Sequence, residues 1–148
     1  MLKTQLLHPE ILEVLGRAGH GSGVLIADGN YPFSTTLGPH AKLVSLNLSP
    51  GLVSGTQVLD ALLSAIPVER ARVMETLKTG PYAVKDDPPI WKEFADRLQA
   101  TGNGVEIERV ERHEFYRQVA QPDVALVVAT GEQRIYANLL LTIGVVLS

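Results

Sequence analysis

The chain has 148 residues, of which 45% are hydrophobic and 20% are charged, as is typical of one compact globular domain. Its net charge of −3, without a cluster of Lys and Arg, argues against nucleic-acid binding, and the absence of cysteine excludes disulfides and thiolate chemistry. No apolar run is long enough to span a bilayer, and Met1 leads into an amphipathic pattern rather than a secretory h-region. We therefore expect a cytoplasmic protein that binds neither nucleic acid nor membrane.

The first half of the chain alternates helical and strand patterns. Residues 9–18 repeat apolar side chains at helical spacing behind a proline in the first turn, and Gly19 is the stop signal. The elements predicted next are a buried strand at 23–28, a loop at 29–41, a half-buried strand at 43–48 and a second helix at 57–66.

The second half continues the alternation. A strand is predicted at 70–76, and a connection rich in Gly, Pro and Asp follows at 79–89; connections of that length in a compact domain are often functional. A third helix opens at Pro89, and the remaining predictions are a strand at 105–110, a helix at 111–120, a buried strand at 124–129 and a strand-like segment at 135–146. Strands that alternate with helices indicate an α/β fold with helices on both faces of a sheet.

Polar residues at the ends of buried strands are the candidates for chemistry, because α/β domains build their sites there. The first such place is Gly19-His20-Gly21, which leads through one strand to Asp28. Because that strand spans most of the sheet, His20 and Asp28 of one chain are expected at opposite ends of it. Taken singly, His20 is more simply a surface loop residue and Asp28 a turn former. The glycines follow a helix and precede a strand, the reverse of a dinucleotide-binding fingerprint, so they do not indicate phosphate binding.

Two further places lie near the C-terminus. Arg112-His113 opens a predicted helix, although a solvated helix face is the simpler interpretation of that pair alone. Thr130-Gly131-Glu132 is followed by Tyr136-Ala137-Asn138, whose Tyr and Asn side chains both donate and accept hydrogen bonds and so suit hydroxyl recognition. The four histidines lack the spacing of a metal site, and no nucleophile elbow is present.

These places, in this order, resemble the fucose mutarotase / D-ribose pyranase family over nearly the whole chain. The matching features are Leu7-His8-Pro9-Glu10, Gly19-His20 with Asp28 and Pro32, Arg112 before Phe115-Tyr116, Thr130-Gly131-Glu132, Tyr136-x-Asn138 and Gly144-Val145. Arg112 stands where ribose pyranases have His, which favours the fucose branch. Two residues depart from the fucose pattern. Ala137 is the residue of ribose pyranases where fucose mutarotases have Gly, and His113 replaces a Phe next to the sugar-binding Arg.

The resemblance implies an isomerase, similar to L-fucose mutarotase, that interconverts the anomers of a free monosaccharide by acid–base ring opening, without a cofactor or a metal. It implies that His20 is the acid–base residue, since imidazole gives and takes protons near neutral pH. The implied substrate-binding residues are Asp28, Arg112, Tyr136, Ala137 and Asn138. The family also implies a three-layer α/β/α sandwich with a mixed sheet, formed by a single domain of residues 1–148. Its members are ring-shaped homo-oligomers, implied here to be a decamer, with sites at subunit interfaces.

Several alternatives stay open at this point. The sugar is fucose or ribose, so a D-ribose pyranase that interconverts pyranose and furanose forms is one alternative, and a non-catalytic monosaccharide-binding protein of the same fold is another. A scaffold protein without a sugar ligand is a third. The pattern also leaves open whether Tyr31 or His113 contacts the sugar. The apolar residues from Leu139 to Leu147 exceed what one strand needs and predict a subunit contact, unless they form a central strand of their own domain.

Overall fold

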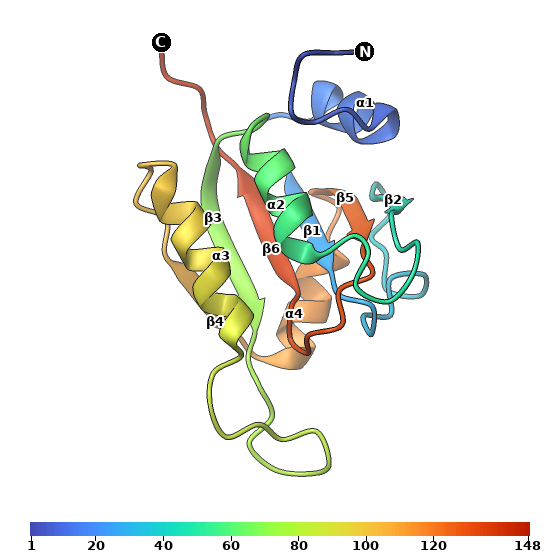
Figure 1. The fold of residues 1–148 in the computed structure, drawn as a ribbon, viewed down its shortest axis with the longest axis vertical. Coiled ribbons are helices and arrows are strands. Elements are labelled where there is room, and N and C mark those ends of the chain that lie inside the picture. The colour runs from blue at the N-terminus through green and yellow to red at the C-terminus, as the bar shows by residue number, and fades with distance from the viewer.

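The computed structural model describes all 148 residues as one α/β domain of four helices and six strands (Figure 1). In chain order the elements are α1 (Pro9–Arg17), β1 (Gly23–Ala27), β2 (Lys42–Ser45), α2 (Gly55–Leu63), β3 (Val68–Met74), α3 (Pro89–Ala100), β4 (Ile107–Val110), α4 (Arg112–Val119), β5 (Val124–Ala129) and β6 (Leu139–Ile143). Local signals account for the helix starts. Ser54 and Gln57 form a reciprocal capping box at α2, and the Glu111 carboxylate caps α4.

The sheet has the strand order β2-β5-β1-β6-β3-β4. Strand β6 runs antiparallel to both of its neighbours, β1 and β3, whereas the other neighbouring pairs are parallel. Five strands therefore end at one edge, the lower edge in Figure 1, and β6 begins there. We call this the carboxyl edge and the opposite one the amino edge. The predicted mixed sheet is confirmed.

Helices cover both faces of the sheet. Alternate residues of β1 show the division: Val24 and Ile26 belong to the apolar cluster under α1, α2 and α3, whereas Leu25 and Ala27 belong to the cluster under α4. Each cluster contains a fully buried phenylalanine from a covering helix: Phe94 of α3 on one face and Phe115 of α4 on the other. The predicted three-layer sandwich is therefore confirmed (Figure 1).

The last strand is shorter than the segment 135–146 that its pattern predicted. Residues 134–138 form a turn and a loop, and β6 covers only Leu139–Ile143. Because β6 lies between β1 and β3, Leu139, Leu140 and Leu141 are fully buried within their own sheet. The central-strand interpretation was thus correct for these residues, and after β6 the exposed apolar side chains are those of Val145, Val146 and Leu147.

The two edge strands are also shorter than predicted. Strand β2 ends at Ser45 and β4 begins at Ile107, because each pairs over four residues with a single neighbour. Strand β3 starts earlier than expected, at Val68, where it pairs with Ile143 of the antiparallel β6. Pairing partners, rather than the pattern of apolar residues, set these boundaries.

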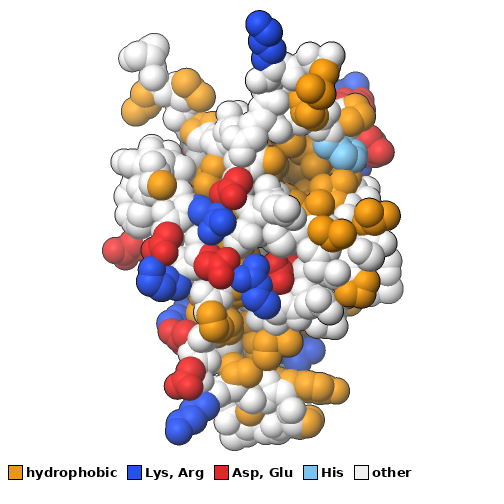
Figure 2. Space-filling view, in the orientation of Figure 1, with side chains coloured by type: hydrophobic (Ala, Val, Ile, Leu, Met, Phe, Trp, Pro, Cys, Tyr) orange, Lys and Arg blue, Asp and Glu red, His pale blue; other side chains and the backbone are white.

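Opposite charges are interspersed on the face drawn in Figure 2, where blue and red side chains lie next to one another across the middle. Ion pairs of the chain include Arg97 with Asp60 at 2.7 Å and Arg134 with Glu93 at 2.8 Å. None of the helices has both the length and the apolar character that crossing a membrane requires.

Candidate active site

The carboxyl edge of the sheet carries a pocket of about 540 Å³. It is lined by four of the residues nominated from the sequence: Asp28 after β1, Arg112 at the start of α4, and Tyr136 and Asn138 ahead of β6. The other lining residues are Asn30, Tyr31, Met74, Pro81, Tyr82, Ala83, Val84, Tyr116 and Ile135. Asp28 and Asn138, 110 positions apart in the chain, meet here because parallel strands end at one edge and the antiparallel β6 begins there.

Asp28 is the buried acid of the pocket, with only 2% of the residue exposed. Its Oδ1 accepts a hydrogen bond from the Asn30 N–H at 2.9 Å, and its Oδ2 accepts from the Ala137 N–H at 3.1 Å and from Asn138 Nδ2 at 3.2 Å. Burial raises the pKa of Asp28 above its ordinary value, although these hydrogen bonds act in the opposite direction. Of about four acceptor positions on a carboxylate, one on Oδ1 is left for a ligand hydroxyl.

Asn138 is bound to Asp28 in both directions. While its Nδ2 donates to the Asp28 side chain, its Oδ1 accepts from the Asp28 backbone N–H at 2.8 Å. This pairing leaves one Nδ2 proton for a ligand. Ala137 is fully buried and does not line the pocket, so its contribution to the site is its backbone N–H.

Tyr136 holds the loop between β3 and α3 against the start of β6. Its hydroxyl accepts a hydrogen bond from the Leu77 N–H at 3.1 Å and donates to the Tyr82 carbonyl at 3.1 Å. Its backbone carbonyl accepts from Trp91 Nε1 at 2.8 Å, and its φ of +58° lies in the left-handed region, which is uncommon for a residue with a side chain. Because the hydroxyl proton is already donated within the chain, the hydroxyl offers a ligand only an acceptor position.

Arg112 is the free cation of the pocket. Its guanidinium makes no hydrogen bond or ion pair within the chain and lies 5.7 Å from the ring centre of Tyr116. Tyr116 in turn packs against Tyr31, with ring centres 5.5 Å apart. All five N–H donors of Arg112 are therefore available to a ligand.

Tyr31 and His113, whose contact with the sugar the sequence left open, lie in different surroundings. Tyr31 lines the pocket and is buried, and its hydroxyl has no hydrogen-bond partner. Burial raises the pKa of Tyr31 above its ordinary range. His113 is exposed and does not line the pocket; its backbone N–H donates to Glu111 at 2.9 Å.

His20 lies at the amino edge, apart from the other nominated residues. Strand β1 separates it from Asp28, and five residues of strand extend about 16 Å. His20 Nε2 is 3.0 Å from both carboxylate oxygens of Glu69, and the two side chains are 60% and 44% exposed. The expectation that His20 and Asp28 of one chain lie at opposite ends of the strand agrees with this geometry.

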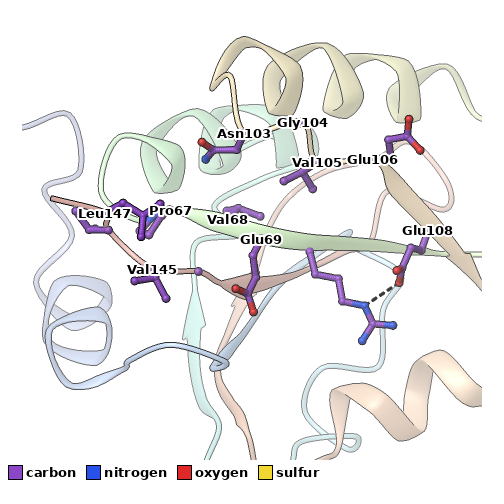
Figure 3. A pocket seen from close by; sticks show the side chains of 13 residues that line it. Pro67, Val68, Glu69, Asn103, Gly104, Val105, Glu106, Glu108, Val145 and Leu147 are labelled. Atoms are coloured by element: carbon purple, nitrogen blue, oxygen red, sulfur yellow. Dashed lines mark hydrogen bonds and ion pairs between the residues drawn. The ribbon is translucent and has the colours of Figure 1, made fainter.

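Glu69 was missed by the sequence analysis, because it stands 49 residues from His20, between the helix predicted at 57–66 and the strand predicted at 70–76. It is the second residue of β3 and lines an open hollow of about 900 Å³ at the amino edge. Figure 3 shows the Glu69 side chain in this hollow, with Val145 of the C-terminal segment beside it.

Glu132 does not line the pocket, but it binds the segments that lead to it. It is 4% exposed, and its carboxylate accepts hydrogen bonds from the Gly55 N–H at the start of α2 and from Arg134 through the backbone N–H, Nε and Nη2. Burial raises the pKa of Glu132, but the hydrogen bonds from Arg134 and Gly55 outweigh burial and hold the pKa at about 2. This carboxylate therefore fixes residues 130–134, through which the chain leads to Tyr136.

No three His, Cys, Asp or Glu side chains are grouped so that they could hold a metal ion. The chemistry that the pocket itself offers is hydrogen bonding: free donors on Arg112 and Asn138, and a free acceptor on Asp28.

The chain is similar to known proteins over nearly its whole length. The family described as "RbsD / FucU transport protein family" matches residues 1–146. The chain is 32% identical to a fucose mutarotase of Homo sapiens over 145 residues, covering 95% of this chain and 90% of that protein. It is 30% identical to a D-ribose pyranase of Actinobacillus pleuropneumoniae, covering 98% and 99%. A crystal structure of a fucose mutarotase from Streptococcus pneumoniae in complex with L-fucose superposes with a TM-score of 0.75 at 28% identity, covering 95% of this chain and 94% of that one.

Proposed function

Because this chain belongs to the RbsD / FucU family, we propose that it is a sugar isomerase that interconverts the anomers of a free monosaccharide, with L-fucose as its substrate. The observation that carries the proposal is the convergence of Asp28, Arg112 and Asn138 on one pocket with unused hydrogen-bonding capacity. A monosaccharide is a ring of neighbouring hydroxyls, each of which both donates and accepts. A pocket that offers a buried acceptor, an amide donor and a planar cationic fork matches that pattern.

Anomer exchange requires proton transfer rather than redox or covalent chemistry. The anomeric hydroxyl loses a proton while the ring oxygen gains one, the ring opens to an aldehyde, and the aldehyde recloses on its other face. A positioned acid–base group is enough to catalyse both transfers. In this proposal Asp28, Arg112 and Asn138 orient the sugar, and His20 moves the proton.

The proposal needs His20 and Asp28 from two copies of the chain, because β1 separates them within one copy. A second copy that places its amino edge on the pocket would bring a histidine to the sugar. The exposed Val145, Val146 and Leu147 at the amino edge would be covered by such a contact. The proposal therefore includes a homo-oligomer with its active sites between subunits. As the family resemblance implies, this oligomer is a decamer.

Glu69 has a definite task in this scheme. When its carboxylate accepts the proton of His20 Nε2, the imidazole is held in the tautomer whose Nδ1 carries the lone pair. Nδ1 is then the atom that takes the proton of the anomeric hydroxyl and returns it. Glu69 thus acts through His20, as a residue that positions the base.

D-Ribose is the second candidate substrate, and a specific residue favours it. The segment Tyr136-Ala137-Asn138 has the alanine of ribose pyranases, and the D-ribose pyranase relative covers nearly the whole chain. Arg112 favours fucose instead, because ribose pyranases carry His there. The two substrates are separated by measuring both with the same protein.

The test is saturation-transfer NMR of L-fucose and D-ribose with the purified protein. We expect faster exchange between the α and β signals of L-fucose, and slower or no acceleration for D-ribose. Acceleration of D-ribose alone would reassign the protein as a ribose pyranase. Saturable sugar binding without faster exchange would instead identify a non-catalytic binding protein. If the protein showed no sugar binding and no faster exchange, it would be a scaffold protein.

A cytoplasmic location is also part of the proposal, as the composition and the nature of a free-sugar substrate suggest. Fractionation of cells that produce the protein at its native level tests it, with the expected signal in the cytoplasmic fraction. Recovery from the membrane or the medium would contradict it.

A further inference from the structure

A buried arginine lies under α4, away from the sugar pocket. Arg72 stands in β3 on the face of the sheet that α4 covers, and only 8% of the residue is exposed. Its Nη1 donates to Gln118 Oε1 at 2.9 Å and its Nη2 donates to Thr142 Oγ1 at 2.7 Å, while its buried Nε has no partner. Both partners are neutral, so no carboxylate pairs with this cation.

The carboxylates around Arg72 are engaged elsewhere or lie in solvent. Glu108, opposite Arg72 on β4, binds Arg70 Nε at 2.8 Å. Glu114 reaches Arg72 only through the amide of Gln118, which donates to Glu114 at 3.2 Å. Asp123 is exposed at the rim. Burial, together with the nearby charge of Arg70, lowers the pKa of Arg72, and the carboxylates of Glu108 and Asp123 only partly offset this. A group in this state is expected to have a counter-ion that the chain itself does not supply.

A cavity of about 230 Å³ lies beside this guanidinium, at the amino edge of the sheet. That volume is several times the roughly 30 Å³ that a water molecule occupies in the liquid. The polar side chains that line it are those of Arg70, Arg72, Gln118, Gln121, Asp123 and Thr142. The cavity therefore has room for a small ion and is walled mainly by hydrogen-bonding groups.

The free donors of the cavity outnumber its free acceptors, which are the carboxylate of Asp123 and the amide oxygens of Gln118 and Gln121. Arg72 uses two of its five N–H groups, and Arg70 uses only Nε, on Glu108. Thr142 accepts from Arg72, so its hydroxyl proton is free to be donated. The backbone N–H groups of Gly21 and Gly23 are already bonded to the carbonyls of Ile143 and Asp123, so the glycine-rich turn supplies no donors. Recognition of an anion would come from the two arginines.

We propose that this cavity binds a small oxyanion of the phosphate class, held by Arg72 and Arg70 with the Thr142 hydroxyl. The planar guanidinium fork matches the spacing of two oxygens on phosphate. The ligand is either free inorganic phosphate or the phosphoryl group of a small metabolite, which share this chemistry. The site is separate from the Asp28 pocket at the carboxyl edge and does not depend on the proposed isomerase activity.

The experiment is isothermal titration calorimetry of the full-length protein with inorganic phosphate, at an ionic strength held constant with sodium chloride. We expect saturable binding that weakens by roughly tenfold or more in Arg72→Gln, since charge-assisted hydrogen bonds are lost. The matched control is Arg17→Gln, an exposed arginine of α1 paired with Glu13, which should bind phosphate like the wild type. Arg70→Gln changes an exposed side chain and leaves Arg72 in place, so it tests the same cavity if Arg72→Gln does not fold.

Parallel titrations with glucose 6-phosphate and with sodium acetate identify the source of the ligand. Tighter binding of glucose 6-phosphate than of phosphate would support a phosphorylated metabolite, and binding of phosphate alone would support the free ion. Tighter binding of acetate than of either phosphate would overturn the phosphate class. No saturable binding, or equal binding by the wild type and both cavity variants, would overturn the site. Dissociation of an oligomer in Arg72→Gln, without phosphate binding by the wild type, would show that a partner subunit neutralises the arginine and would also overturn it.

Discussion

The two edges of the sheet differ in how completely the chain satisfies its own polar groups. At the carboxyl edge, Asp28 and Asn138 are buried and bound to each other through two hydrogen bonds, so their orientation is set before any ligand arrives. At the amino edge, the His20 and Glu69 side chains are 60% and 44% exposed, and the hydrogen bond of each is to the other. The contrast teaches that one edge has a formed pocket but no histidine, while the other has the histidine outside that pocket.

The two unpaired arginines repeat the contrast. Arg112 at the carboxyl edge is partly exposed, so water can solvate its charge until a ligand binds. Arg72, on the amino-edge side, is buried with an unpaired Nε, and it faces a cavity that has room for an ion. Arg112 therefore suits a neutral polyol, whereas Arg72 suits an anion.

Replacement of the amino-edge base should have the largest effect. We expect His20→Ala to slow sugar exchange by about a hundredfold or more, the range of general acid–base catalysis, with little change in fold because the side chain is 60% exposed. Saturation-transfer NMR measures the exchange and circular dichroism checks the fold. His40→Ala, at an exposed histidine bonded to the Pro122 carbonyl, is the matched control. Exchange near the wild-type rate in His20→Ala would remove the amino edge from the chemistry.

Mixing two inactive variants should restore part of the activity if the edges of different copies meet. In a one-to-one co-assembly of His20→Ala with Asp28→Asn, roughly a quarter of the sites would combine an intact histidine with an intact aspartate. Arg112→Ala is a second partner variant, because Arg112 makes no hydrogen bond or ion pair in its own chain. The recovered exchange rate and the mass from light scattering are measured together. No recovery in a confirmed mixed oligomer, or full wild-type activity in a monomer, would contradict the shared site.

A change within the carboxyl edge should alter selectivity more than rate. We expect Arg112→His to shift the ratio of exchange rates from L-fucose toward D-ribose by about tenfold, because imidazole cannot reproduce the planar fork of arginine. The ratio is measured in one sample that contains both sugars. Arg117→His, on the exposed face of the same helix, is the control. An unchanged ratio would mean that Arg112 does not select the substrate.

Acid should weaken the support behind the carboxyl edge, which is the smallest expected effect. The pKa of Glu132 is held at about 2 in the folded chain, below its ordinary value of 4.5, so its contribution to stability is complete above pH 4.5 and is lost as the pH falls toward 2. Urea unfolding between pH 6 and 3 measures this loss. Glu132→Gln should be less stable at pH 6 and should show a flatter pH dependence. An identical pH dependence in the two proteins would contradict the assignment.

The sequence by itself determined the local parts of this protein. The alternation of helices and strands, the buried character of β1 and β5 and the polar residues at the strand ends could be predicted, because apolar periodicity and turn residues are encoded over short stretches. The family resemblance added which of those residues to group, and Asp28, Arg112, Tyr136 and Asn138 do line one pocket.

The tertiary structure decided what depends on partners far along the chain. The His20–Glu69 pair, the use of the Tyr136 hydroxyl to hold the β3–α3 loop, and the isolation of Arg72 carry no local signal. The same holds for β6, which is confined to Leu139–Ile143 because it pairs with β1 and β3, so that Tyr136 and Asn138 ahead of it line the pocket. The physical reason is that strand order fixes these contacts, and strand order is a property of the assembled sheet rather than of any single segment.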